Sequence, residues 1–143
     1  MLNGECLCGQ VAFTVSGQYR KLYQCHCSLC RKATGSSANA GLFVAANDFQ
    51  WLRGADHLSR FTRSTGYCAA FCTACGSPAP NRFGETLVWI PAGLLAETEE
   101  MDVVVHLHTD SKACWDTIAD NVTQQAGGIR VSELLALLAG HSA

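Results

Sequence analysis

Cys72-Thr73-Ala74-Cys75-Gly76 is the stretch that most constrains the fold of this 143-residue chain. Two cysteines separated by two residues and followed by glycine form a tight turn in which both sulfurs can converge on one ion. A second pair, in Cys6-Leu7-Cys8-Gly9, lies near the start of the chain. Together the two pairs supply four sulfurs, the number that closes a tetrahedral zinc shell. The sequence therefore predicts a structural zinc site that joins two distant segments.

A third cluster, Cys25-His26-Cys27-Ser28-Leu29-Cys30, supplies three cysteines. Three protein ligands leave one position of a zinc shell open to an exchangeable ligand, which is the arrangement of a catalytic site. We therefore expect two unequal zinc ions, one structural and one catalytic.

Composition supports metal binding over disulfides. The chain has 48% hydrophobic and 15% charged residues, which is typical of one globular domain. Its nine cysteines cannot all pair, because the number is odd. The first five residues, Met1 to Glu5, lack the basic and apolar regions of a signal peptide, so a cytoplasmic location is expected. Thiols stay reduced in that compartment, which favours metal ligation.

Charge and hydropathy exclude two classes of partner. The formal net charge is -2 and the pI is about 6.2, so the general basic footprint of a nucleic-acid-binding protein is absent. The apolar runs are too short for a membrane span. Oligomeric state is left open by the sequence.

Apolar and polar residues alternate in several short stretches separated by glycines, which predicts a mainly β domain. The expected strands cover residues 9–15, 42–44, 58–62, 86–90 and 101–107. Loops or single helical turns are expected at 47–49 and 111–115. Near the C-terminus, Ser132 and Glu133 precede four leucines and predict a short helix.

Four segments together resemble the glutathione-dependent formaldehyde-activating enzyme family, which shares its domain with centromere protein V. They are residues 4–13, 25–35, 71–78 and 110–113 with Trp115. The resemblance covers residues 4–116 of a single domain spanning 1–143, and residues 117–143 form a C-terminal extension. Cys114 stands where the family usually has proline.

This resemblance implies a β-tent fold, in which small coiled antiparallel sheets surround two zinc sites. Cys6, Cys8, Cys72 and Cys75 would hold the structural zinc, and Cys25, Cys27 and Cys30 the catalytic zinc. The implied thiol is glutathione and the implied carbonyl compound is formaldehyde. The expected activity is that of a carbon–sulfur lyase or synthase, with S-hydroxymethylglutathione as the adduct.

Other polar residues have both a functional and a structural interpretation. Cys68 is a possible fourth ligand of the second site, although a small apolar strand residue is the simpler interpretation. His26 is expected to point away from the metal, because its neighbours Cys25 and Cys27 point toward it. His106 and His108 fit the polar face of an amphipathic strand better than a chelating pair.

Arg31, Lys32 and Lys112 are candidates for binding the carboxylates of a tripeptide such as glutathione. Ordinary solvated cations are the alternative. Two further functions also remain open. One is a zinc-stabilised, non-catalytic binding module or adduct carrier, and the other is a redox dithiol at Cys27-x-x-Cys30.

Overall fold

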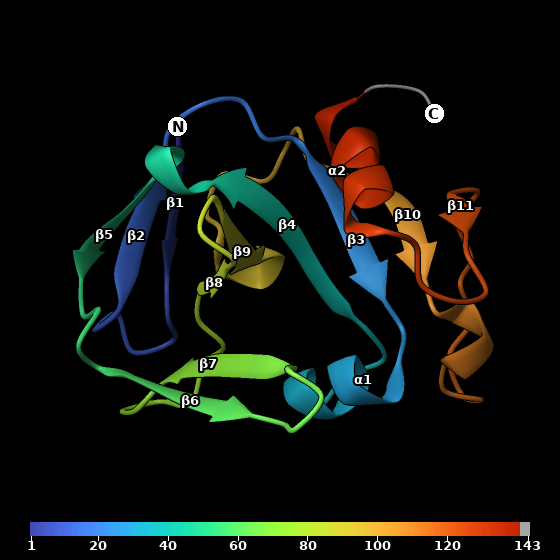
Figure 1. Ribbon diagram of the computed structural model, residues 1–143, viewed down its shortest axis with the longest axis horizontal. Helices are drawn as coiled ribbons and strands as arrows, with labels where there is room; N and C mark the ends of the chain where they lie inside the picture. Colours follow the sequence, from blue (N-terminus) through green and yellow to red (C-terminus); the bar gives the residue numbers. More distant parts are fainter. Residues whose placement is uncertain (141–143) are drawn as a thin grey trace. The chain divides into compact units, whose positions relative to one another are not determined.

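The computed structural model of the protein describes residues 1–140 and is mainly β, as the sequence predicts (Figure 1). The chain forms two compact units. The first unit comprises Met1–Gln18 and Phe43–Glu99, and the second comprises Tyr19–Leu42 and Glu100–Ala143. Within residues 1–140, no helix is long and apolar enough to cross a membrane.

The first unit is built from short antiparallel strands. One sheet has the order β1–β2–β5, and β6 pairs with β7 while β8 pairs with β9. Two 3-10 turns, η1 (Ala46–Asp48) and η2 (Ala92–Leu94), lie between strands. The strands are β1 (Leu2–Glu5), β2 (Ala12–Val15), β5 (Phe49–Arg53), β6 (Leu58–Thr62), β7 (Cys68–Cys72), β8 (Asn81–Phe83) and β9 (Leu87–Pro91).

Phe13 is the centre of the core beneath the β1–β2–β5 sheet. Its buried ring stacks on Phe49 with centroids 5.5 Å apart and meets the edge of Trp51 at 6.2 Å. Gly4 on β1 is required here, because a Cβ at that position would lie 2.3 Å from Cζ of Phe13. This packing fixes β1, and the chain leaves β1 directly into Cys6.

The second unit is organised around β3 (Lys21–Cys25). On one side β3 pairs antiparallel with β4 (Asn39–Ala45), whose last three residues belong to the first unit. On the other side it pairs parallel with β10 (Asp102–Leu107), which in turn pairs parallel with β11 (Thr123–Gln124). Helix α1 (Ser28–Thr34) follows β3 after two residues, and the 3-10 turn η3 (Thr109–Ser111) follows β10.

Helix α2 (Val131–Ala139) packs against β3 and β10 and is the predicted C-terminal helix. It begins with a capping box in which the Glu133 side chain accepts hydrogen bonds from Arg130, and Leu134 is its buried residue. The helix ends at Gly140, whose φ of 85° suits glycine. The extension predicted at 117–143 therefore includes β11 and α2, and its last three residues lie outside the described part of the chain.

The strands expected at 58–62 and 86–90 agree closely with β6 and β9. The sheets were predicted to be antiparallel, but β10 runs parallel to both of its neighbours, β3 and β11. Parallel pairing needs a long connection between strands, which the local pattern does not reveal. Helix α1 was not predicted from the sequence, because its N-cap is Cys27 and not one of the usual polar N-cap residues.

Candidate metal centres

The four cysteines of the predicted structural site lie together in the first unit. Cys6 and Cys8 follow β1, whereas Cys72 ends β7 and Cys75 lies in the turn after it. Their four Sγ atoms all lie within 4.8 Å of one another. Cys6 and Cys72 are buried beside Val11, Trp51 and Leu58 and belong to the core, whereas Cys8 is exposed.

The sulfur spacing of this group fits zinc. A tetrahedral ion with Zn–S bonds of about 2.3 Å places neighbouring sulfurs about 3.8 Å apart. The Sγ atoms of Cys6 and Cys8 are 3.5 Å apart, and those of Cys8 and Cys72 are 3.9 Å apart. All nine cysteines are free, and four sulfurs at this spacing form a donor set of the kind that holds zinc.

Backbone amides hold both turns in the shape that the sulfurs require. The amide of Gly9 donates to the carbonyl of Cys6 at 2.9 Å, and the amide of Gly76 donates to Cys72 at 2.8 Å. Val11 donates its amide to Sγ of Cys6 at 3.3 Å, an interaction that favours a thiolate. A hydrogen bond with Ser77 lowers the pKa of Cys75 to about 5.

The other three cysteines lie together in the second unit. Cys25 is the last residue of β3, Cys27 is the N-cap of α1, and Cys30 lies in the first turn of that helix. Their Sγ atoms also lie within 4.8 Å of one another, and no described His, Asp or Glu joins the group. Cys27 accepts the amide of Cys30 at its sulfur, at 3.4 Å, so α1 positions two of the three sulfurs.

Because these sulfurs lie close together, the pKa values of Cys25 and Cys30 shift in opposite directions. A hydrogen bond with Cys30 lowers the pKa of Cys25 to about 6, against the opposing effect of burial. The same interaction raises the pKa of Cys30. At neutral pH the group thus shares protons unequally, and a divalent cation would relieve the mutual repulsion of three thiolates.

The two remaining cysteines belong to neither group. Cys68 begins β7 in the first unit, is half-buried, and accepts a hydrogen bond at its carbonyl from Asn81. Cys114 is exposed. This agrees with the simpler interpretation of Cys68 as a strand residue.

The three predicted carboxylate-binding cations differ in their contacts. Arg31 on α1 donates through Nη2 to the carbonyl of Ser111 at 3.2 Å, while its Nε is buried without a partner. Lys112 donates to the carbonyl of Asp116 at 2.9 Å and is otherwise exposed. Lys32 is exposed on the last turn of α1. Arg31 therefore has a structural contact as well as a free donor.

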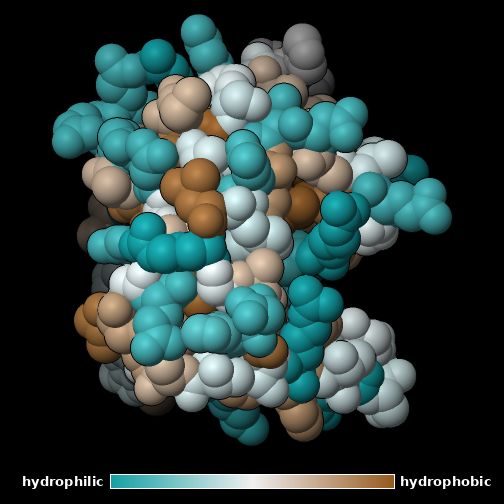
Figure 2. Space-filling view, turned by 90° about the vertical axis from the view of Figure 1, so that its left-hand side faces the viewer, coloured by the Kyte–Doolittle hydropathy of each residue, from teal (hydrophilic) through white to brown (hydrophobic). Residues whose placement is uncertain are grey.

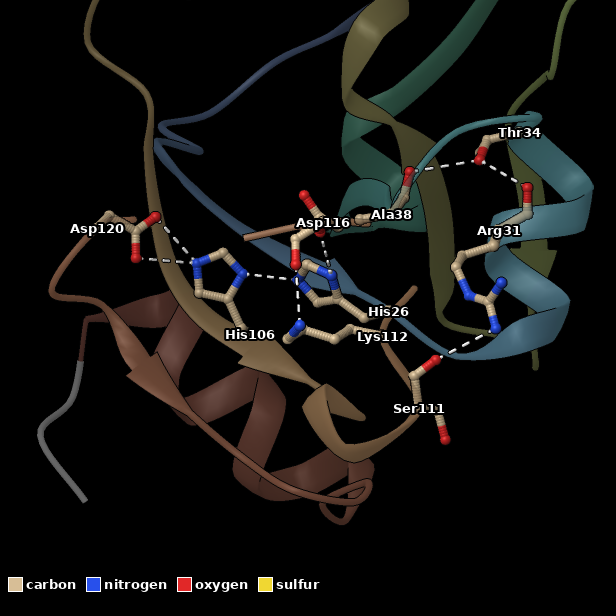
Figure 3. A network of polar contacts seen from close by, with 9 residues as sticks. All are labelled: His26, Arg31, Thr34, Ala38, His106, Ser111, Lys112, Asp116 and Asp120. Atoms are coloured by element: carbon tan, nitrogen blue, oxygen red, sulfur yellow. Dashed lines mark hydrogen bonds and ion pairs between the residues drawn. The ribbon is translucent and has the colours of Figure 1, made fainter. Parts of the chain in front are cut away.

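A buried histidine pair lies beside the three-cysteine group in the sequence and connects β3 to β10 (Figure 3). His26 and His106 are each only 2% exposed. Nε2 of His26 lies 2.9 Å from Nδ1 of His106, whose Nε2 lies 3.0 Å from Oδ2 of Asp120. Burial, followed by repulsion from His106, lowers the pKa of His26. The hydrogen bond from His106 lowers the pKa of Asp120.

The prediction that His106 lies on a solvated polar strand face is wrong. The pairing of β10 with β3 shifts register between Val103 and Val105, and the three residues from Val105 to Leu107 are all buried. His108 does not share the strand face either, because it follows β10 with a φ of 54°. Alternation alone could not reveal this, although an unusual density of histidine near the strand end is a usable signal.

This mainly β chain gathers four cysteines at one place and three at another, and each group could hold a metal ion. The model of the glutathione-dependent formaldehyde-activating enzyme family matches residues 1–111. The chain belongs to this family.

Two comparisons agree with this membership. A Halomonas elongata protein named "Putative glutathione-dependent formaldehyde-activating enzyme" is 26% identical over 124 residues, covering 80% of this chain and 79% of that protein. A crystal structure of a Rhodobacter sphaeroides protein superimposes with a TM-score of 0.55 and 22% identity, covering 71% of this chain and 98% of that one. The second likeness shows the fold alone.

Proposed function

We propose that this protein is a zinc-dependent carbon–sulfur lyase or synthase that acts on glutathione-type thiol adducts. S-hydroxymethylglutathione, formed from formaldehyde and glutathione, is the substrate that family membership favours. The observation that carries the proposal is the three-cysteine group, because it offers one sulfur fewer than the four-cysteine group. An incoming thiol would complete the set.

The donor sets support zinc at both positions. Every ligand offered is a thiolate, which selects zinc over harder cations, and the sulfur spacing of the first group matches a tetrahedral shell. Cys6, Cys8, Cys72 and Cys75 would hold the structural ion, and Cys25, Cys27 and Cys30 the second one. When bound at the second position, zinc supplies a Lewis acid that favours the thiolate form of a thiol near neutral pH.

The reaction forms a carbon–sulfur bond, opens the π bond of the carbonyl group and moves one proton from sulfur to oxygen. The sulfur of the thiol bonds to the carbonyl carbon, and the proton of the thiol ends on the former carbonyl oxygen. The lyase direction breaks the same carbon–sulfur bond and returns the proton to sulfur. The residues of this chain would hold the thiol at Cys25, Cys27 and Cys30, with Arg31, Lys32 and Lys112 attracting its carboxylates.

Exchange spectroscopy on a mixture of glutathione and ¹³C-formaldehyde tests the proposal. The protein should accelerate interconversion between free formaldehyde and the hydroxymethyl adduct, and Cys27→Ser should abolish the acceleration. Cys114→Ser removes a cysteine that belongs to neither group and serves as the matched control. Acceleration that survives Cys27→Ser would contradict the assignment of the site.

An adduct carrier or zinc-stabilised binding module is the alternative. Binding of glutathione without acceleration would favour a carrier, and retention of two zinc ions without glutathione binding would favour a module. A module of this kind usually presents a continuous apolar or basic surface. On the face drawn in Figure 2, hydrophobic residues lie interspersed among hydrophilic ones.

A further inference from the structure

We propose that His106 and Asp120 are positioning residues for the three-cysteine group, and that they act through the ring of His26. The proposal rests on the metal-binding part of the proposed function and is independent of the reaction. Asp120 lies beyond residue 111, where the match to the family model ends. The C-terminal extension would therefore contribute to the metal centre.

The series of hydrogen bonds runs from His26 through His106 to Asp120, and the carboxylate of Asp120 fixes their directions. Both carboxylate oxygens of Asp120 lie within 3.1 Å of Nε2 of His106, and a carboxylate can only accept, so this nitrogen carries the proton. The other nitrogen of a neutral imidazole is then an acceptor. It lies 2.9 Å from Nε2 of His26, which must donate. Asp120 thus selects one tautomer of both rings.

His26 is held by its backbone as well as its ring. Its amide donates to the carbonyl of Leu107 at 2.9 Å, so backbone and side chain both bind β10. The far side of the ring, at Nδ1, faces Oδ2 of Asp116 at 3.7 Å. Because Cys25 and Cys27 are the residues on either side, fixing His26 fixes the turn that presents their sulfurs.

Asp120 is itself held in place by secondary structure. Its Oδ1 accepts the amide of Val122 at 3.1 Å, and β11 begins at the next residue. Strand β11 pairs with β10 at His106, whose carbonyl also accepts the amide of Gln125 at 2.8 Å. The carboxylate is therefore held beside His106 by the bend that leads into the paired strand β11.

The energetic consequence should be local. Without the acceptor on Asp120, both rings can change tautomer or rotate, and the turn between Cys25 and Cys27 samples more conformations. Loss of hydrogen-bond partners outside the ligand set typically weakens metal binding by about 10- to 100-fold. The four-cysteine group is built from residues of the first unit, whereas the three network residues belong to the second, so it provides an internal reference.

The test measures Co²⁺ and Zn²⁺ affinity at each group separately in the full chain, using the thiolate charge-transfer and d–d absorption of Co²⁺. Asp120→Ala should weaken metal binding at the three-cysteine group by about tenfold or more and leave the four-cysteine group unchanged. Asp120→Asn keeps an acceptor oxygen and should restore most of the affinity. Asp102→Ala removes an exposed carboxylate from β10, the strand that carries His106, and should have no effect at either group.

Equal weakening at both groups would mean a general structural role and overturn the proposal. So would wild-type affinity in Asp120→Ala, or failure of Asp120→Asn to restore it. His106→Asn keeps an acceptor near the position of Nδ1, whereas His106→Leu removes it. Metal affinity at the three-cysteine group should therefore be higher in His106→Asn than in His106→Leu, and equal affinities would count against the proposal. No glutathione or other small-molecule thiol is added in these measurements, so the expected pattern would stand even if the enzyme activity were absent.

Discussion

The amide of Leu7 donates to Oγ of Ser77 at 2.9 Å, across 70 residues of sequence. Leu7 lies between the first two cysteines of the four-cysteine group, and Ser77 follows the last of them by two residues. The two turns of this group are therefore joined directly, and Ser77 also contacts the sulfur of Cys75 at 3.3 Å. A metal bound there would strengthen a connection that the protein already makes.

Removal of a ligand from the four-cysteine group should destabilise the whole first unit. Cys6→Ser or Cys75→Ser is expected to lower the melting temperature by about 10 °C or more, because a structural zinc contributes much of the folding free energy. Cys27→Ser should lower it by about 5 °C or less. Thermal melts compare these variants with Cys68→Ser, and equal losses for the two classes would contradict the division.

Gly54 should tolerate alanine far less well than Gly66, although both have positive φ, at 74° and 88°. A Cβ at Gly54 would lie 2.2 Å from the carbonyl oxygen of Gln10, whereas nothing lies within 4 Å of one at Gly66. Gly66→Ala should cost about 1–2 kcal/mol for its left-handed backbone. Gly54→Ala should cost about 1–3 kcal/mol more from the clash. Denaturant unfolding measures both, and similar losses would contradict the close approach.

The spacing of the cysteines predicted the paired ligands within each group, because sulfurs one or two residues apart are brought together by a local turn. Strands β6 and β9 were predictable from the residues within them. The parallel pairing of β10 and the contact between His26 and His106 were not, since the partners are 80 residues apart. Asp120 lies in a segment without a motif, so its contact with His106 could be found only in the structure.

Two unequal metal sites should appear in a stepwise chelation. The three-cysteine group should lose its ion first, because the protein provides fewer sulfurs there, and the four-cysteine group should retain its ion. Zinc content measured after each addition of chelator, with sulfur coordination followed by X-ray absorption, checks this. Release of both ions in one step, or one ion at full loading, would argue against two independent sites.

Metal binding at the three-cysteine group should weaken as the pH falls, since protons compete for the sulfurs. The pKa of Cys25 is lowered to about 6, so above this pH Cys25 is already a thiolate and metal binding releases one proton fewer. A plot of log affinity against pH should therefore become steeper below about pH 6. Chelator competition at a series of pH values measures the slope, and a slope that flattens in acid would be inconsistent with the assigned pKa.

The central claim is that an exogenous thiol completes the three-cysteine group through its sulfur. Calorimetric titration with glutathione and with S-methylglutathione, in buffers of different ionisation enthalpy, tests it most directly. Glutathione should bind with release of a proton, because the bound form is the thiolate. S-methylglutathione should bind much more weakly, since a thioether cannot lose a proton, and Cys27→Ser should weaken binding of glutathione to the same level. Equal affinity for the two compounds, without proton release, would contradict the account.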